Sequence, residues 1–255
     1  MKSTLKNLSF AIVAMALLGL GACKKKENII PLPADGSVKV QFSYVFGSAA
    51  LPWALNKEMV HTKTGDTLTF STFRFYVSNV KLQRKDGSWW TQPESYYLVD
   101  ASSTAASSFT IPAVPANDYV AMQYTMGVDS TRNVSGANTG ALALSNGMFW
   151  DWNSGYIMLK AEGYSPNSPT NSFAFHLGGF SGENNIVTVK TADFGKSIAV
   201  GGNAAAMTVK MLANPARLWH SSPNLQTRST IHMPGPDAKI MARDFYDNIT
   251  FAGIE

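Results

Sequence analysis

The sequence is poor in the residues that most often build cross-linked or reactive sites. Its 255 residues include one cysteine, Cys23, and four histidines, and only 15% are charged. A single cysteine excludes disulfide bonds within the chain. The motifs of common active sites are also missing: there is no Gly-x-Ser-x-Gly elbow, no His-Glu-x-x-His helix and no phosphate-binding glycine loop. We therefore expect a protein that is not an enzyme.

Long apolar runs are missing as well. The run Phe10–Leu20 has eleven residues, whereas a membrane-spanning helix needs about 20. The run follows two lysines and leads to small residues just before Cys23, which is the order of an export signal. Leu20-Gly21-Ala22-Cys23 is similar to a lipobox. This predicts that residues 1–22 are a signal peptide and that lipid, such as palmitate, on Cys23 anchors a bacterial cell-envelope lipoprotein to a membrane, facing the periplasm or on the outer-membrane surface.

Excess charge is absent from the predicted mature chain. The full sequence has a formal net charge of +4, but residues 1–22 hold two lysines and no acid. Cleavage before Cys23 would leave the mature chain nearer to neutral, so nothing in the charge indicates nucleic-acid binding. Residues 23–36 begin with a lysine cluster and contain Pro31 and Pro33, a composition typical of a tether.

Residues 37–255 are dominated by two-residue alternation of apolar and polar side chains. Thr67–Leu82 is the strongest such stretch, with a break or bulge expected near Ser71-Thr72, and Asp86-Gly87 predicts a hairpin turn after it. The helical signal is weak and lies mainly at Ala238–Asn248. We therefore predict a single all-β domain, an antiparallel β-sandwich of jelly-roll or Ig-like type with few short helices. Further strands are expected at Val38–Phe42, Tyr96–Asp100, Ala121–Met126, Tyr156–Glu162, Asn171–Leu177, Ile186–Lys190 and Met207–Met211.

Four stretches carry a resemblance when they are taken together and in order. They are Phe73–Leu82 (FRFYVSNVKL), Gly127–Gly136 (GVDSTRNVSG), Gly147–Tyr156 (GMFWDWNSGY) with the following Lys160–Gly163 (KAEG), and Phe173–Gly179 (FAFHLGG). This order and composition resemble the MbnP-like family of periplasmic copper-binding proteins. From the first to the last, the four stretches extend over residues 73–179 of the predicted mature chain.

The resemblance implies an all-β sandwich that binds copper, in some members through histidines and a tryptophan oxidised to kynurenine. It also implies a partner di-haem oxidase that performs this oxidation. The residues give no basis for choosing which tryptophan would be modified, among Trp53, Trp150, Trp152 and Trp219. The first strand region, where copper-binding members tend to carry a histidine, reads Phe42–Gly47 here and contains none.

Any copper ligands must then come from the four histidines, with methionine thioether as a soft helper. His176 lies at a predicted strand end before Gly178-Gly179. His232 precedes Met233-Pro234-Gly235, and this loop would let imidazole and thioether face one ion. His61, before the strongest strand, is the third candidate. Each of the three also has a simpler interpretation as a solvated or hydrogen-bonded loop residue, and His220 is interpreted in that way.

Two functions remain open on the sequence alone. The first is a lipid-anchored, non-catalytic copper protein for sequestration or transfer. The second is a cell-surface binding or structural β-sandwich without metal. Such a protein could bind glycans if Trp89, Trp90, Tyr96 and Tyr97 form an aromatic cluster. A third feature, the polar loop Asp129–Gly136, lacks the spaced acids of a calcium loop, and we expect Asx-type hydrogen bonds and an Asp129–Arg132 pairing there instead.

Overall fold

Two β-sheets contain about half of the residues that the structure describes. The computed structural model describes residues 34–135, 138–150 and 155–255. The predicted signal peptide, the predicted lipidation site Cys23 and most of the predicted tether lie outside these residues, and so does Trp152. Contacts join Pro33–Glu255 into one unit. No helix among the described residues is both long and apolar enough to cross a bilayer.

The smaller sheet is built on β1 (Gly36–Phe46). Its strands follow the order β15-β13-β1-β2, and β7 also pairs with β1. β1 runs parallel to β13, with Val40 beside Val209, although the two strands lie at opposite ends of the sequence. The other members of this sheet are β2 (Leu51–Pro52), β7 (Ser108–Val114), β13 (Met207–Ala213) and β15 (Thr250–Ile254).

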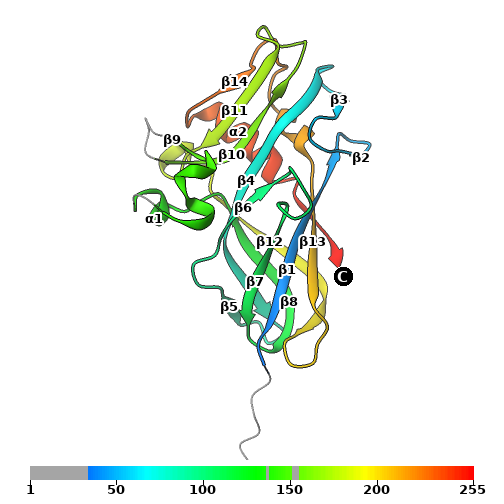
Figure 1. Ribbon diagram of the computed structural model, residues 1–255, viewed down its shortest axis with the longest axis vertical. Helices are drawn as coiled ribbons and strands as arrows, with labels where there is room; N and C mark the ends of the chain where they lie inside the picture. Colours follow the sequence, from blue (N-terminus) through cyan, green and yellow to red (C-terminus); the bar gives the residue numbers. More distant parts are fainter. Residues whose placement is uncertain (1–33, 136–137, 151–154) are drawn as a thin grey trace, which may run out of the picture. The chain divides into compact units, whose positions relative to one another are not determined.

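The larger sheet is built on β4 (Thr67–Arg84), the longest strand, which crosses the middle of the view in Figure 1. Its main order is β12-β8-β4-β10-β11-β14; β3, β5 and β6 pair with β4, and β9 pairs with β10. These strands are β3 (Glu58–Val60), β5 (Trp89–Thr91), β6 (Tyr96–Asp100), β8 (Asn117–Met126), β9 (Phe149–Trp150), β10 (Gly155–Tyr164), β11 (Ser172–Gly178), β12 (Thr188–Val200) and β14 (Thr230–Ile231).

The alternation in β4 explains how this strand packs. Phe70, Phe73 and Phe75 are fully buried, and the change of parity between Phe70 and Phe73 falls where the register against β10 shifts. The extra residue at this irregularity is Ser71, because Glu162 pairs with Thr72 while Gly163 pairs with Phe70. This is the β-bulge expected from the sequence, and it keeps large aromatic side chains on one face on both sides of the bulge.

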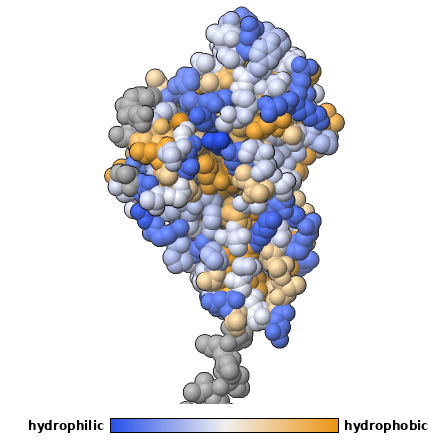
Figure 2. Space-filling view, viewed as in Figure 1, coloured by the Kyte–Doolittle hydropathy of each residue, from blue (hydrophilic) through white to orange (hydrophobic). Residues whose placement is uncertain are grey.

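Helices are few and short. The longest, α2 (Pro236–Tyr246), contributes Phe245, whose ring lies 5.2 Å from that of Phe73 and 5.5 Å from that of Phe75. Within the face predicted for this helix, Met241 and Phe245 are buried, but Ile240 is exposed. On the face shown in Figure 2, the hydrophobic residues form separate patches between hydrophilic ones.

The predicted all-β sandwich with few helices is confirmed. It differs from a purely antiparallel arrangement at two places, because β1–β13 and β11–β14 are parallel pairs. The Asp86-Gly87 hairpin is also confirmed, since Leu82 of β4 pairs with Trp90 of β5 and the Ser88 amide donates to the Asp86 carboxylate.

Candidate metal centre

The outer face of the β10–β11 pair carries three polar side chains close together. Phe173, Phe175 and Leu177 of β11 are buried against the core, so the intervening His176 points to the opposite face. Lys160 lies directly opposite His176 in the antiparallel register, and Glu162, two residues further along β10, lies diagonally across. Lys160, Glu162 and His176 therefore share one face of the sheet.

A short parallel strand brings His232 to this face. Thr230 and Ile231 of β14 pair with Ala174 and Phe175 of β11, so the next residue, His232, lies beside His176. The Nδ1 atoms of the two histidines are 3.3 Å apart. Their ring centroids are 4.8 Å apart and the rings are nearly perpendicular, at 84°. The structure thus brings together two of the three histidines that the sequence singled out.

Glu162 determines which ring nitrogen of His176 carries a proton in the neutral form. Its carboxylate accepts a hydrogen bond from Nε2 of His176 at 2.6 Å. Because a carboxylate only accepts, Nε2 carries the proton, and a neutral His176 ring must then present an unprotonated Nδ1. This Nδ1 is the atom that faces His232. The hydrogen bond from His176 holds the pKa of the Glu162 carboxyl at about 2, with Lys160 contributing further.

His232 presents a neutral ring. Burial lowers the pKa of His232, and the neighbouring His176 lowers it further. A histidine with a lowered pKa is mostly neutral at pH 7, so its ring has a lone pair available for a ligand. The two Nδ1 atoms share a hydrogen bond, so one of the rings carries its proton, and an ion that displaces this proton would meet two imidazole nitrogens.

The spacing of this pair suits a metal ion. Two imidazole nitrogens, each about 2.0–2.1 Å from one tetrahedral ion, stand about 3.3 Å apart. This equals the separation between Nδ1 of His176 and Nδ1 of His232. Glu162 then takes the role of the carboxylate that orients a metal-binding histidine from behind. Among the described residues no group of three His, Cys, Asp or Glu side chains is arranged to hold an ion, so the pair by itself is a two-ligand site.

The loop after His232 forms a hollow beside the pair. Its lining includes Ile231, His232, Met233 and Pro234, and the ion pair between Arg228 and Asp237 closes one end at 2.8 Å. Met233 is 59% exposed, so its thioether is accessible from solvent. Soft ligands such as this thioether favour copper over magnesium or calcium.

His61 lies elsewhere, in the interior. It is buried, with its Nε2 3.0 Å from the Ala216 carbonyl and its Nδ1 accepting from the Thr64 amide at 3.1 Å. Its ring packs against those of Phe46 and Trp219. Burial lowers the pKa of His61. Both ring nitrogens already have protein partners, and the structure does not bring this residue to the His176–His232 pair.

Trp150 lies against the end of the strand that carries His176. It is buried, and its ring lies so close to Gly178 that a Cβ added there would be 2.4 Å from it. Trp150 also lines a hollow together with Gly179 and Pro234. It thus neighbours the segments that follow both His176 and His232. Trp53 and Trp219 are buried among phenylalanines instead.

The aromatic residues considered for glycan stacking do not form a single cluster. Tyr97 stacks on Phe109, with ring centroids 3.9 Å apart, and Tyr96 donates to the Asp129 carboxylate at 2.7 Å. Trp89 and Trp90 lie on β5, which pairs with a different part of β4 from β6.

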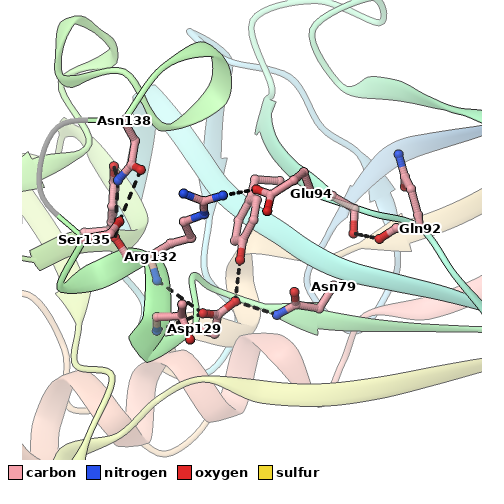
Figure 3. Close-up of polar contacts among 11 residues, drawn as sticks. Asn79, Gln92, Glu94, Asp129, Arg132, Ser135 and Asn138 are labelled. Atoms are coloured by element: carbon pink, nitrogen blue, oxygen red, sulfur yellow. Dashed lines mark hydrogen bonds and ion pairs between the residues drawn. The ribbon is translucent and has the colours of Figure 1, made fainter.

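The loop after β8 is held by hydrogen bonds to the Asp129 carboxylate, and the Asp129 and Arg132 side chains do not pair with each other (Figure 3). The Asp129 carboxylate caps α1 (Ser130–Asn133) by accepting from two backbone amides, and it also accepts from Asn79 and Tyr96. The Arg132 side chain instead pairs with Glu94. The predicted side-chain pairing of Asp129 with Arg132 is therefore wrong, because only the Arg132 backbone amide reaches the carboxylate.

Glu162 was not singled out from the sequence as a site residue. Glu162 lies two residues after Lys160, so both side chains are on one face of the strand. The register that brings them to His176 has no local sequence signal.

Comparisons with known proteins agree with this architecture. The family profile described as MbnP matches residues 35–233. In a search of solved structures, MbnP from Methylosinus trichosporium matches with a TM-score of 0.52 and 16% sequence identity, over 81% of this chain and 87% of that chain. At that sequence identity the structural match shows a similar fold and nothing further. No curated protein sequence matches the chain significantly.

Proposed function

The chain belongs to the MbnP family, and from this premise we propose that it is a lipid-anchored, extracytoplasmic copper-binding protein that sequesters or transfers the ion without catalysis. The copper is held between Nδ1 of His176 and Nδ1 of His232. The observation that carries the proposal is the 3.3 Å separation of these two nitrogens, together with the bond from Nε2 of His176 to Glu162, which turns Nδ1 of His176 toward His232.

The donor set favours copper over other ions. Imidazole nitrogen suits zinc, copper and nickel, and among first-row divalent ions copper binds a given nitrogen site most tightly. The exposed Met233 thioether follows His232 directly and adds a soft donor, which favours the reduced ion. An accessible pair with neutral rings is able both to take up the ion and to release it to a partner.

Copper titration of the purified protein tests the metal site. Competition with a coloured copper chelator gives the affinity of the wild type and of His176→Ala, His232→Ala and the double variant. Loss of a side chain that hydrogen-bonds a metal ligand typically lowers metal affinity by about 10–100-fold. Loss of the ligand itself should therefore lower copper affinity by more than about 100-fold. His220→Ala is the matched control, because His220 is exposed and lies in another loop. Copper binding of unchanged strength in the double variant would refute the site.

The anchor is supported by the sequence features around Cys23, which lie outside the described residues. Growth with labelled palmitate should label the wild-type protein and leave Cys23→Ser unlabelled. The variant should also move from the membrane fraction to the soluble fraction. Labelling of the Cys23→Ser variant would reject this part of the proposal and leave the copper site untouched.

The di-haem oxidase remains a proposed partner through the family resemblance. If such an enzyme acts on this chain, Trp150 is the described tryptophan whose position suits a role beside the histidine pair. Mass spectrometry of tryptic peptides from native protein would show whether the peptide containing Trp150 carries oxidised tryptophan. An unmodified peptide would count against this partner.

A further inference from the structure

A second hollow lies at the other end of β1 from Gly36, where β1, the loop after β3 and a short 3-10 helix (Pro215–Trp219) meet. Ser48, His61, Lys63, Arg217 and His220 are among its lining residues. In Figure 1, β1 rises from Gly36 to the region of β2 and β3. Eleven extended residues place its two ends roughly 30 Å apart.

The lining of this hollow is cationic. It includes Lys63 and Arg217, and no lining residue is acidic. Across the described ranges, neither Lys63 nor Arg217 belongs to an ion pair. Other charged surface residues on this chain do find partners, as Arg228 does with Asp237. The two positive charges at the hollow are therefore not neutralised by the protein.

The two nearby carboxylates, Asp66 and Asp244, accept hydrogen bonds from groups outside the hollow. Asp66, close to His61, is 3% exposed and accepts from the Leu225 amide at 3.1 Å. Asp244 accepts from the amide and hydroxyl of Ser221. Neither acid lines the hollow, and neither forms an ion pair with Lys63 or Arg217.

The walls of the hollow are held in place. His61 is fixed by bonds at both ring nitrogens, and the Asn214 side chain bonds both the amide and the carbonyl of Gly47, at 3.1 and 2.9 Å. The Lys63 ammonium donates to the His220 carbonyl, which ties the loop after β3 to the end of the 3-10 helix. A binding site with walls fixed in this way loses little conformational entropy when it takes up a ligand.

We propose that this hollow binds a small oxyanion of the phosphate type, either the free ion or the terminal phosphate monoester of a small molecule. Arginine presents a planar fork that matches phosphate oxygens, and lysine adds a point charge. The hollow encloses about 220 Å³, which is below the range of about 300–1,000 Å³ typical for drug-sized ligands. A compact anion fits these dimensions better than a large organic molecule.

This site is separate from the histidine pair. Trp219, which packs on His61, contacts the inward-facing ring of Phe175, whereas His176 projects from the opposite face of the same strand. The proposal therefore does not depend on copper binding, and each can fail without the other.

Calorimetric titration of the full chain at low salt with inorganic phosphate, and separately with glycerol 3-phosphate, tests the proposal. We expect saturable binding of inorganic phosphate that weakens as sodium chloride is added. Lys63→Met and Arg217→Met should each weaken it by at least tenfold. Binding of inorganic phosphate alone identifies a free-ion site, whereas binding of both identifies a monoester site.

Two matched variants separate the hollow from general surface charge. Lys57 is also an exposed lysine that donates to a backbone carbonyl, that of Pro52, and Arg243 is an exposed arginine on α2. Lys57→Met and Arg243→Met should bind phosphate like the wild type. The absence of phosphate binding by wild-type protein, or equal losses in the hollow variants and these controls, would overturn the proposal. Circular dichroism spectra establish that each variant is folded.

Discussion

The Glu162 carboxylate accepts a hydrogen bond from Nε2 of His176 on the neighbouring strand, at 2.6 Å and on a diagonal of the β10–β11 register. This contact sets which nitrogen of His176 is free for an ion. Its effect on copper is therefore indirect, since Glu162 orients a ligand from behind. At the proposed copper site, the strength of binding should therefore depend on a residue that need not touch the ion.

Glu162→Ala should weaken copper binding by about 10–100-fold, because His176 loses the partner that fixes its tautomer and ring orientation. Glu162→Gln should fall between Glu162→Ala and the wild type, since its amide oxygen can still accept from Nε2. Chelator competition measures both. Glu58→Ala, on the exposed side of β3, is the control. If Glu162→Ala binds as tightly as the wild type, the carboxylate does not orient the ligand.

His61→Leu should destabilise the fold and leave copper binding unchanged. The variant loses the bonds to Ala216 and Thr64 and leaves a buried carbonyl and amide without partners, at a cost of about 2–4 kcal/mol. Urea unfolding measures the loss, and His220→Leu, at an exposed position, should change stability by less than about 0.5 kcal/mol. A folded His61→Leu protein with much weaker copper binding would instead identify His61 as a ligand.

The buried position of His61 also makes stability depend on pH. Burial lowers the pKa of His61 in the folded state, whereas the unfolded chain keeps a value near 6.5. Between these two values the unfolded state binds more protons, so stability must fall as the pH falls. The contribution is complete above about pH 6.5 and declines below it. Unfolding curves from pH 7.5 to 5 should show this slope, and it should be smaller in His61→Leu. Identical slopes in both proteins would assign the effect to other groups.

The sequence predicted the strands well where alternation is strong. Phe70, Phe73 and Phe75 alternate within β4 and require a bulge near Ser71, and the structure has one there. The parallel pairing of β1 with β13 was not predicted, because nothing local in either strand records a partner so distant in the chain. Pairing direction depends on packing of the whole sheet rather than on a strand's own pattern.

The candidate site was predictable only in part, for a related reason. His176 and His232 were chosen by residue type, but their approach depends on β14, which has two residues and therefore no periodic signal. Glu162 went unrecognised because its role comes from the register of β10 against β11. His61 looked similar to the others in sequence, and only its burial and its partners in the fold distinguish it.

Asp129→Ala should destabilise the loop that follows β8. The Asp129 side chain caps α1 and also accepts from Asn79 and Tyr96, and these bonds lower its pKa despite the opposing effect of burial. Loss of a cap costs about 1 kcal/mol, and the two further bonds to a charged acceptor should raise the total to about 3 kcal/mol. Thermal unfolding compares the variant with Asp118→Ala, whose side chain has no such role. An equal change in the two variants would contradict a supporting function for Asp129.

Gly163→Ala should destabilise the sheet because of close approach rather than backbone conformation. A Cβ at this position would lie 2.2 Å from the Thr69 carbonyl oxygen and 2.6 Å from the Phe173 ring, so β4 or β10 must shift. Overpacking of this kind costs about 1–3 kcal/mol, and we expect the upper end because one of the clashing atoms belongs to the backbone. The movement of Phe173, three residues before His176, should also weaken copper binding. Gly235→Ala is the control for stability alone, since a Cβ there meets no atom within 4 Å and its φ of 173° is extended. Urea unfolding measures the change in stability, and copper titration measures the change in affinity. A Gly163→Ala protein as stable as Gly235→Ala would show that the sheet accommodates the added methyl group without loss of stability.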